Sequence, residues 1–110
     1  MSGVLYAVYT WVPEDVLPEW NAWHSGVHVP NVLKAPEMRG AVKLRVTDTN
    51  LEGWRPQYVT LYTLDSLEDY AAYRDGYGLQ MRQEYDARYS GVGKVARVVM
   101  VEELRAGARG

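Results

Sequence analysis

The sequence predicts an α+β fold in which four strands and two helical regions follow the order βαββαβ. Segments rich in β-branched and aromatic residues stand near both ends of the chain. Between them, apolar residues recur first every three or four positions, then at every second position, and then again every three or four. Because 110 residues is a common length for one domain, residues 1–110 are expected to share a single core, with 104–110 as a flexible tail.

The first strand is expected over residues 3–12, GVLYAVYTWV, where β-branched and aromatic residues dominate and a proline follows. The first helix is expected from about Leu17, because Pro18 is tolerated only in a first turn. Its apolar residues, spaced by three and four, continue to Gly26, which is expected to weaken or end the helix. Pro30 then starts a second short turn.

A hairpin is expected in the middle of the chain. Residues 39–47, RGAVKLRVT, alternate apolar and basic side chains, which is typical of a half-buried strand. The turn-rich segment 48–56 separates them from a second strand over 57–64, QYVTLYTL. The length of this connection predicts a mobile loop.

The second helical region is expected to begin at Asp65 or Ser66, since either side chain can cap a helix N-terminus. It is expected to break at Gly76 and Gly78 before it resumes. The last strand is expected over 94–104, KVARVVMVEEL, which is rich in valine.

This element order is the split βαβ arrangement known as ferredoxin-like, in which helices cover one face of a single antiparallel sheet. The other face also needs cover, because the first and last strands carry apolar side chains toward both sides. We therefore expect a homodimer whose protomers pack sheet against sheet.

Composition excludes several classes of function. A net charge of −2 gives no basic surface for DNA or RNA, so no nucleic-acid partner is expected. The chain has no cysteine and therefore no disulfide, thiolate nucleophile or thiolate metal site, which fits a cytoplasmic protein. The apolar N-terminal run has no basic leader and is interrupted by Thr10, so we interpret it as a strand rather than a signal peptide or membrane span. The glycines lack the strand-to-helix context of a phosphate loop, so no nucleotide cofactor is expected.

The stretch 19–33, EWNAWHSGVHVPNVL, holds both histidines of the chain and two of its four tryptophans. His24 and His28, with Trp20, stand at four-residue steps and form one stripe if the helix continues past Gly26. Histidine is the natural general base near neutral pH, and apolar neighbours favour its neutral form. We predict His28 and His24 as catalytic residues. The alternative is that both are packed or rim histidines without chemistry.

Two histidines four residues apart could also hold a metal, as in the helical H-E-x-x-H arrangement. The glutamate of that motif is absent and no third ligand is obvious, so no metal is expected. Haem bound through one histidine is kept as a minority alternative to a protein without cofactors.

Side chains from the strands would complete a pocket beside this helix. Arg45 could neutralise a carboxylate or a developing enolate, or it could be an ordinary surface arginine. The candidate substrate-binding residues are Trp20 and Trp23 on the helix and Tyr6, Tyr9, Trp11, Arg45, Tyr58 and Tyr62 on the strands.

The βαββαβ order, together with W-N-A-W-H-S-G-V-H-V-P-N-V-L and A-P-E-M-R-G-A-V-K-L, resembles the EthD-like branch of the dimeric α+β barrel superfamily. Trp23 matches the tryptophan of the family's first helix, and residues 28–30 match its His-hydrophobic-Pro signature. Residues 36–40 stand where the family has a Pro-Gly turn before the second strand.

The chain departs from the family pattern at three positions. His24 replaces an aromatic residue, Ser25 replaces an acid, and Val27 replaces a glutamate that commonly precedes the histidine. His28 is therefore expected to have no carboxylate partner on this helix, and the question is whether His24 takes that role.

The resemblance implies a dimeric α+β barrel with a pocket in each protomer between the helices and the concave side of the sheet. It also implies relatives that include cofactor-free monooxygenases of aromatic polyketides, polyketide cyclases, lactone isomerases and haem-degrading or haem-containing enzymes.

The leading hypothesis is a small cofactor-independent enzyme that uses histidine acid/base chemistry on a hydrophobic, carbonyl-bearing or aromatic small molecule. The expected reaction is an isomerisation, cyclisation, elimination or dehydration. The alternatives are a cofactor-free or haem-dependent monooxygenase of aromatic or polyketide substrates, and a non-catalytic small-molecule-binding protein.

Overall fold

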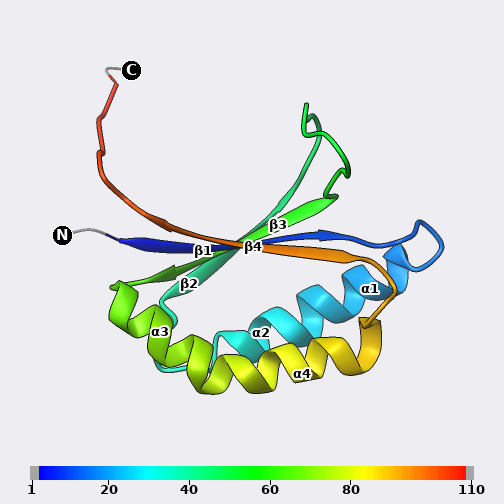
Figure 1. Cartoon of the computed structure of the whole chain (residues 1–110), viewed down its shortest axis with the longest axis horizontal. Coiled ribbons are helices and arrows are strands. Elements are labelled where there is room, and N and C mark those ends of the chain that lie inside the picture. The colour runs from blue at the N-terminus through cyan, green and yellow to red at the C-terminus, as the bar shows by residue number, and fades with distance from the viewer. Residues whose placement is uncertain (1–2, 109–110) are drawn as a thin grey trace.

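The computed structural model describes residues 3–108, which form a four-stranded antiparallel sheet with all helices on one face (Figure 1). The strands are β1 (Val4–Trp11), β2 (Gly40–Arg45), β3 (Tyr58–Leu64) and β4 (Lys94–Val101). Their order in the sheet is β2-β3-β1-β4, and each neighbouring pair is antiparallel. The predicted ferredoxin-like α+β fold is confirmed.

The helices form two segments that lie side by side beneath the sheet (Figure 1). The first consists of α1 (Leu17–Trp23), a π-helical turn η1 (His24–His28) and α2 (Val29–Val32). The second consists of α3 (Leu67–Asp75) and α4 (Tyr77–Tyr89). Within residues 3–108, none of the helices has both the length and the apolar character that a bilayer crossing requires.

The sheet register decides which side chains meet the helices. Tyr6 of β1 pairs with Tyr62 of β3 and with Val99 of β4, so these residues share a face. Because side chains alternate along a strand, the even-numbered residues of β1 all lie on this face. Val4 and Tyr6 belong to the main core together with Val32, Tyr73 and other buried residues, and Val8 packs against it.

The opposite face of the sheet carries no helix in the described part of the chain and is apolar (Figure 1). Val42 is 54% exposed and Val98 is 43% exposed, and Met100 lies beside them on the same face. The expectation that both faces of the sheet are apolar therefore agrees with the structure.

Of the two outcomes expected at Gly26, the helical segment does not end there, but its regular α-helical geometry is interrupted by the π turn η1. The backbone continues in helical geometry because the amide of Val29 donates to the carbonyl of His24, five residues earlier. Pro30 has no amide hydrogen to donate, and the wider π turn before it accommodates that interruption. The amide of Leu33 donates to the carbonyl of Val29 at 3.1 Å, so the segment runs on to Val32.

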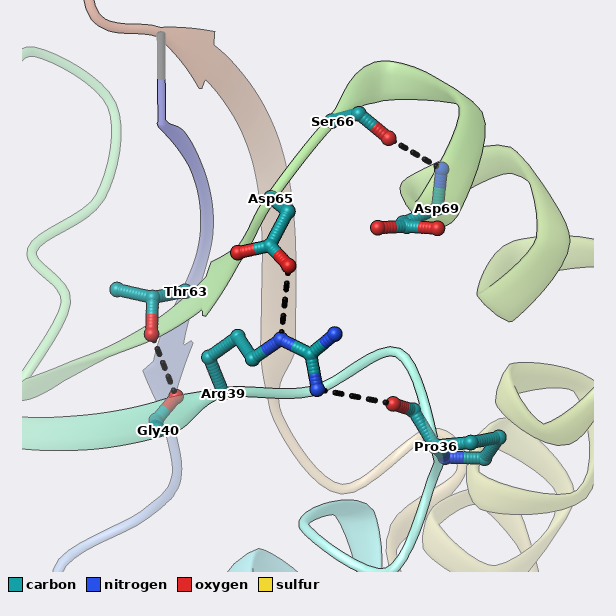
Figure 2. A network of polar contacts seen from close by, with 7 residues as sticks. All are labelled: Pro36, Arg39, Gly40, Thr63, Asp65, Ser66 and Asp69. Carbon is teal, nitrogen blue, oxygen red and sulfur yellow. Dashed lines mark hydrogen bonds and ion pairs between the residues drawn. The ribbon is translucent and has the colours of Figure 1, made fainter. Parts of the chain in front are cut away.

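The start of the second helical segment is set by a polar cluster at the sheet edge (Figure 2). The Ser66 hydroxyl accepts a hydrogen bond from the Asp69 amide at 3.1 Å, which is the predicted N-cap. The Arg39 side chain donates to Asp65 at 2.9 Å and so ties the residue before β2 to the end of β3. This contact joins the two strands of the expected hairpin at the end opposite the loop 46–57.

Of the two expected breaks, only Gly76 interrupts the helix. Its backbone, with φ −115° and ψ −108°, separates α3 from α4. Gly78 instead lies within α4, where a Cβ atom would come within 2.7 Å of the Tyr73 carbonyl oxygen. Gly78 therefore permits a close approach between helices rather than a break.

The strands are shorter than expected by one to three residues at six of their ends. The first strand ends at Trp11, β2 ends at Arg45, and β4 ends at Val101 rather than residue 104. Of the expected tail 104–110, residues 104–108 contain no helix or strand, and 109–110 lie outside the described residues. Residues 1–2, at the other end of the expected domain, also lie outside them.

Candidate functional site

A small cavity lies between the sheet and the two helical segments. Its volume of about 30 Å³ is enough for about two water molecules. The lining side chains combine aromatic, apolar and basic groups. They are Tyr6, Val8, Thr10, His24, His28, Val32, Tyr62, Tyr73, Met81, Arg82, Tyr85, Val95 and Arg97.

His24 is only 2% exposed, and its ring stacks on Trp20 with a centroid distance of 4.4 Å and an interplanar angle of 14°. Burial lowers its pKa to about 3, and the positive charge of Lys43 contributes in the same direction. His24 is therefore neutral at physiological pH. Its Nδ1 atom has no hydrogen-bond partner among the described residues.

His28 has a partner that the first helix does not supply. Its Nδ1 lies 3.3 Å from Oε2 of Glu84 on α4, and the other carboxylate oxygen accepts a hydrogen bond from Asn31 at 2.9 Å. Because an ionised carboxylate only accepts, Nδ1 of neutral His28 carries the proton and Nε2 keeps its lone pair. Burial lowers the pKa of His28, and Glu84 partly offsets this effect.

The sequence predicts that His28 has no carboxylate partner on the first helix. In the folded protein a different element, α4, supplies one. Glu84 replaces the missing helix acid from a segment 56 residues away. It follows the buried Met81 by three residues and precedes the buried Tyr85, so the helical period places it beside the packed face of α4. That signal identifies the face, and only the tertiary structure identifies His28 as the partner.

A second polar link runs behind His24. The indole Nε1 of Trp20, which is fully buried, donates to the hydroxyl oxygen of Tyr85 at 3.0 Å. The hydroxyl of Tyr85 thus keeps its own hydrogen to donate toward the cavity that Tyr85 lines. Thr10, also a lining residue and 2% exposed, has an Oγ1 atom without a partner in the described part of the chain.

Lys43 connects β2 to the first helical segment next to the cavity. Its ammonium group lies 4.8 Å from the Trp20 ring centroid and 4.6 Å from that of Tyr58. It donates to Asn21 Oδ1 at 2.6 Å and to Ser25 Oγ at 2.8 Å. Burial lowers the pKa of Lys43 to about 8.

The aromatic residues predicted for the site occupy different places. Tyr62 and Tyr6 line the cavity. Trp20 and Trp23 lie behind the histidines, since Trp23 stacks on His28 at 5.0 Å and Trp20 stacks on His24. Both indole rings thus pack against the imidazole rings.

Three other residues predicted for the site do not line this cavity. Tyr9 and Trp11 lie on the opposite face of β1, since odd and even residues of a strand point to opposite sides. Arg45 is exposed at the end of β2 and is not among the lining residues.

Tyr58 also stands apart from the cavity wall. It contacts Lys43 and Trp20, whose ring centroid lies 5.6 Å away. The arginines that do line the cavity are Arg82 and Arg97, which the sequence reasoning did not select. Arg97 interrupts the valines of β4 at a helix-facing position, and this was the available signal.

The site offers little to a metal or haem. Among residues 3–108, no three histidine, aspartate or glutamate side chains gather as a metal site. A haem is far larger than a cavity of about 30 Å³, although Nε2 of His28, whose Nδ1 faces Glu84, keeps the lone pair that a haem iron would need. In this conformation the cavity therefore does not admit a haem.

The comparisons with known proteins agree with this architecture. Residues 3–103 match the family model described as a domain of unknown function, DUF4286. No curated protein matches the sequence.

Several solved structures resemble the fold. An EthD family protein from Bacillus halodurans C-125 is similar with a TM-score of 0.66 and 19% identity, over 96% of this chain and 100% of that chain. The haem degrader MhuD from Mycobacterium tuberculosis, solved with two haems in its active site, is similar with a TM-score of 0.63 and 19% identity, over 94% of this chain and 99% of that chain. SnoaB, a cofactor-independent oxygenase from Streptomyces nogalater, is similar with a TM-score of 0.63 and 10% identity, over 94% of this chain and 95% of that chain.

At these identities the likeness concerns the fold, and at that level the predicted EthD-like, ferredoxin-like architecture is confirmed. The family model, in contrast, covers almost the whole sequence. This chain therefore belongs to the DUF4286 family.

Proposed function

We propose that the protein is a small cofactor-independent enzyme in which His28 transfers a proton to and from a small molecule held in the cavity. The observation that supports this most strongly is the contact of 3.3 Å between His28 Nδ1 and Glu84 Oε2 at the cavity wall. A carboxylate in this position orients the imidazole and stabilises the imidazolium that forms when Nε2 accepts a proton.

The proton balance of the proposed step is simple. Nε2 of His28 takes a proton from the carbon next to a substrate carbonyl, the electron pair of that C–H bond forms a C=C bond, and the π pair of the carbonyl moves to its oxygen to give an enolate. The imidazolium then returns the proton to another carbon, or to a leaving group in an elimination. Isomerisation, cyclisation, elimination and dehydration all share this first step.

His24 and Tyr85 support the step without taking the proton. With a pKa near 3, His24 is too weak a base to be protonated near neutral pH. The hydroxyl of Tyr85, which accepts from Trp20, can donate to the developing oxyanion. The unpartnered Nδ1 of His24 offers a further polar contact to a ligand.

The substrate class follows from the walls. Val8, Val32 and Met81 are apolar and lie beside tyrosines, so the cavity suits a hydrophobic molecule with a carbonyl or phenol group. Because the cavity holds only about two waters, a substrate of that kind needs the helical segments to move away from the sheet.

The proposal is tested by deuterium incorporation. A panel of enolisable ketones and lactones is incubated with the protein in D₂O, and exchange at the carbon next to the carbonyl is followed by mass spectrometry. We expect exchange with at least one compound and its loss in His28→Gln. Exchange that continues unchanged in His28→Gln would refute the role of His28.

A cofactor-free monooxygenase is the second candidate. SnoaB, described as a cofactor-independent oxygenase, has a similar fold, and the tyrosine-rich walls suit an aromatic substrate. Consumption of oxygen with a hydroquinone would favour this candidate. Saturable binding without any chemical change in the ligand would instead favour a binding protein.

The proposed enzyme is a homodimer in which a second copy covers the helix-free face of the sheet. Val42, Val98 and Met100 leave this face apolar and exposed. The loop 46–57 and the segment after β4 both rise from the sheet on this side, so they flank the space that a second sheet would occupy (Figure 1). A stable monomer seldom exposes such a continuous apolar face.

A further inference from the structure

Two arginines from different elements line the same cavity. Arg82 lies on α4 and is half-buried. Arg97 lies on β4 opposite Val8 of β1, on the face that the helices cover, and it is exposed where the cavity meets solvent. No aspartate or glutamate is among the lining residues.

Neither arginine is neutralised by an acid within the described part of the chain. The ion pairs formed by residues 3–108 involve Glu84, Asp65, Asp75 and Glu102, and none of them includes Arg82 or Arg97. Arg82 instead donates to the backbone carbonyl of Arg74 at 3.0 Å. Two positive charges beside one cavity repel each other, and a bound anion would remove that repulsion.

The charge of these arginines reaches the groups inside the cavity. Burial lowers the pKa of His28 and Arg97 acts in the same direction, while both arginines act against the burial that raises the pKa of Tyr6 and Tyr73. An anionic group held by Arg97 would thus lie within electrostatic range of the proposed base. A planar guanidinium binds a planar carboxylate with two parallel hydrogen bonds, which also fixes its orientation.

We infer that the ligand of this cavity is a small organic acid whose carboxylate is held by Arg97 and Arg82. This inference rests on the proposed function in one respect, namely that the cavity is the substrate site. It assigns specificity to two arginines on α4 and β4, and it replaces Arg45, which the sequence suggested for the same role.

The two histidines make the site easy to observe, because the chain has only these two and both line the cavity. The imidazole C–H signals in an NMR spectrum therefore report on this site alone. The probes are acetate and benzoate, with acetamide and benzamide as uncharged counterparts of similar shape. We expect saturable shifts of the histidine signals with at least one acid, and shifts at least tenfold weaker in affinity with its amide.

The variants are Arg97→Gln, Arg82→Gln and, as the matched control, Arg45→Gln, which alters an exposed arginine outside the cavity. We expect the dissociation constant of the acid to rise at least tenfold in Arg97→Gln and to stay unchanged in Arg45→Gln. Arg97→Lys keeps the charge and should bind with intermediate affinity. Equal binding of acid and amide, or unchanged binding in both cavity variants, would overturn the inference.

The same experiment separates this inference from the proposed function. In His28→Gln the signals of His24 still report on binding, and the acid is expected to bind while proton exchange is lost. If exchange depends on His28 but acids have no preference over amides, only the carboxylate inference fails. If acids bind through Arg97 but exchange does not depend on His28, only the proposed function fails.

Discussion

His28 and Glu84 face each other across the two helical segments, with 3.3 Å between Nδ1 and Oε2. The carboxylate is itself held by the Asn31 amide at 2.9 Å, so three residues from η1, α2 and α4 form one chain of contacts. This arrangement leaves Nε2 of a neutral imidazole as the basic atom of the site.

Replacement of Glu84 by glutamine should weaken the proposed base. The carboxylate raises the pKa of His28 against burial, so Glu84→Gln should lower that pKa further. Loss of the charged partner should also slow proton exchange by about 10²-fold. NMR titration and deuterium incorporation measure the two effects. Asp86→Asn, at an exposed position on the same helix, is the control and should change neither.

The low pKa of His24 predicts how stability depends on pH. The unfolded chain binds a proton on this residue below pH 6.5, whereas the folded protein binds it only near pH 3. Folding is therefore favoured fully above pH 6.5, and stability falls as the pH drops from 6.5 toward 3. His24→Phe removes this dependence while it keeps a ring on Trp20. Urea unfolding at pH 7.5 and 5.0 should show that wild type loses about 2 kcal/mol more than the variant. Equal losses would contradict the burial of a neutral His24.

The hydrogen bond from Trp20 to Tyr85 should contribute to stability. In Tyr85→Phe the buried indole Nε1 has no acceptor, and the unfolding free energy should fall by about 1–3 kcal/mol. Chemical denaturation measures this loss. Tyr70→Phe is a suitable control, because Tyr70 is only partly buried and keeps its ring contact with Tyr6 when the hydroxyl is removed. A similar loss in both variants would show that the Trp20 contact has no special weight.

The proposed dimer should dissociate when a charged residue is placed on the helix-free face of the sheet. Val98→Glu places a carboxylate on a residue that is 43% exposed on that face, and the proposed dimer should become monomeric. Leu79→Glu alters a residue of similar exposure, 47%, on α4 and should leave the dimer intact. Sedimentation velocity distinguishes the two states. A wild-type monomer, or a dimer disrupted only by Leu79→Glu, would contradict the proposed interface.

Local patterns predicted the elements of the fold because each depends on neighbours in sequence. Alternation identified the strands, the hydroxyl of Ser66 identified a helix start, and Gly76 identified a break. Four-residue spacing also placed Trp20, His24 and His28 together, although Gly26 was expected to interrupt them. The π turn that carries the helix past Gly26 depends on a hydrogen bond between Val29 and His24 that no propensity predicts.

The rest of the candidate site depends on contacts between segments distant in sequence. Glu84 meets His28, and Arg97 meets the cavity, only after α4 and β4 have packed against the first segment. The prediction that Tyr9 and Trp11 share a pocket with Tyr6 conflicts with the two-residue period of a strand, because odd- and even-numbered residues of β1 lie on opposite faces. The alternation of the strand was sufficient to exclude them, since neighbours in a strand point to opposite faces.

The central claim is that His28, held by Glu84, is the base. The most direct measurement compares the pKa of His28 from NMR titration with the pKa that governs proton exchange in the same protein. The account predicts that the exchange rate rises with pH through a pKa below 6.5, that this pKa equals that of His28, and that Glu84→Gln lowers both together. An exchange rate whose pH dependence does not follow the titration of His28, or one that persists in His28→Gln, would contradict it.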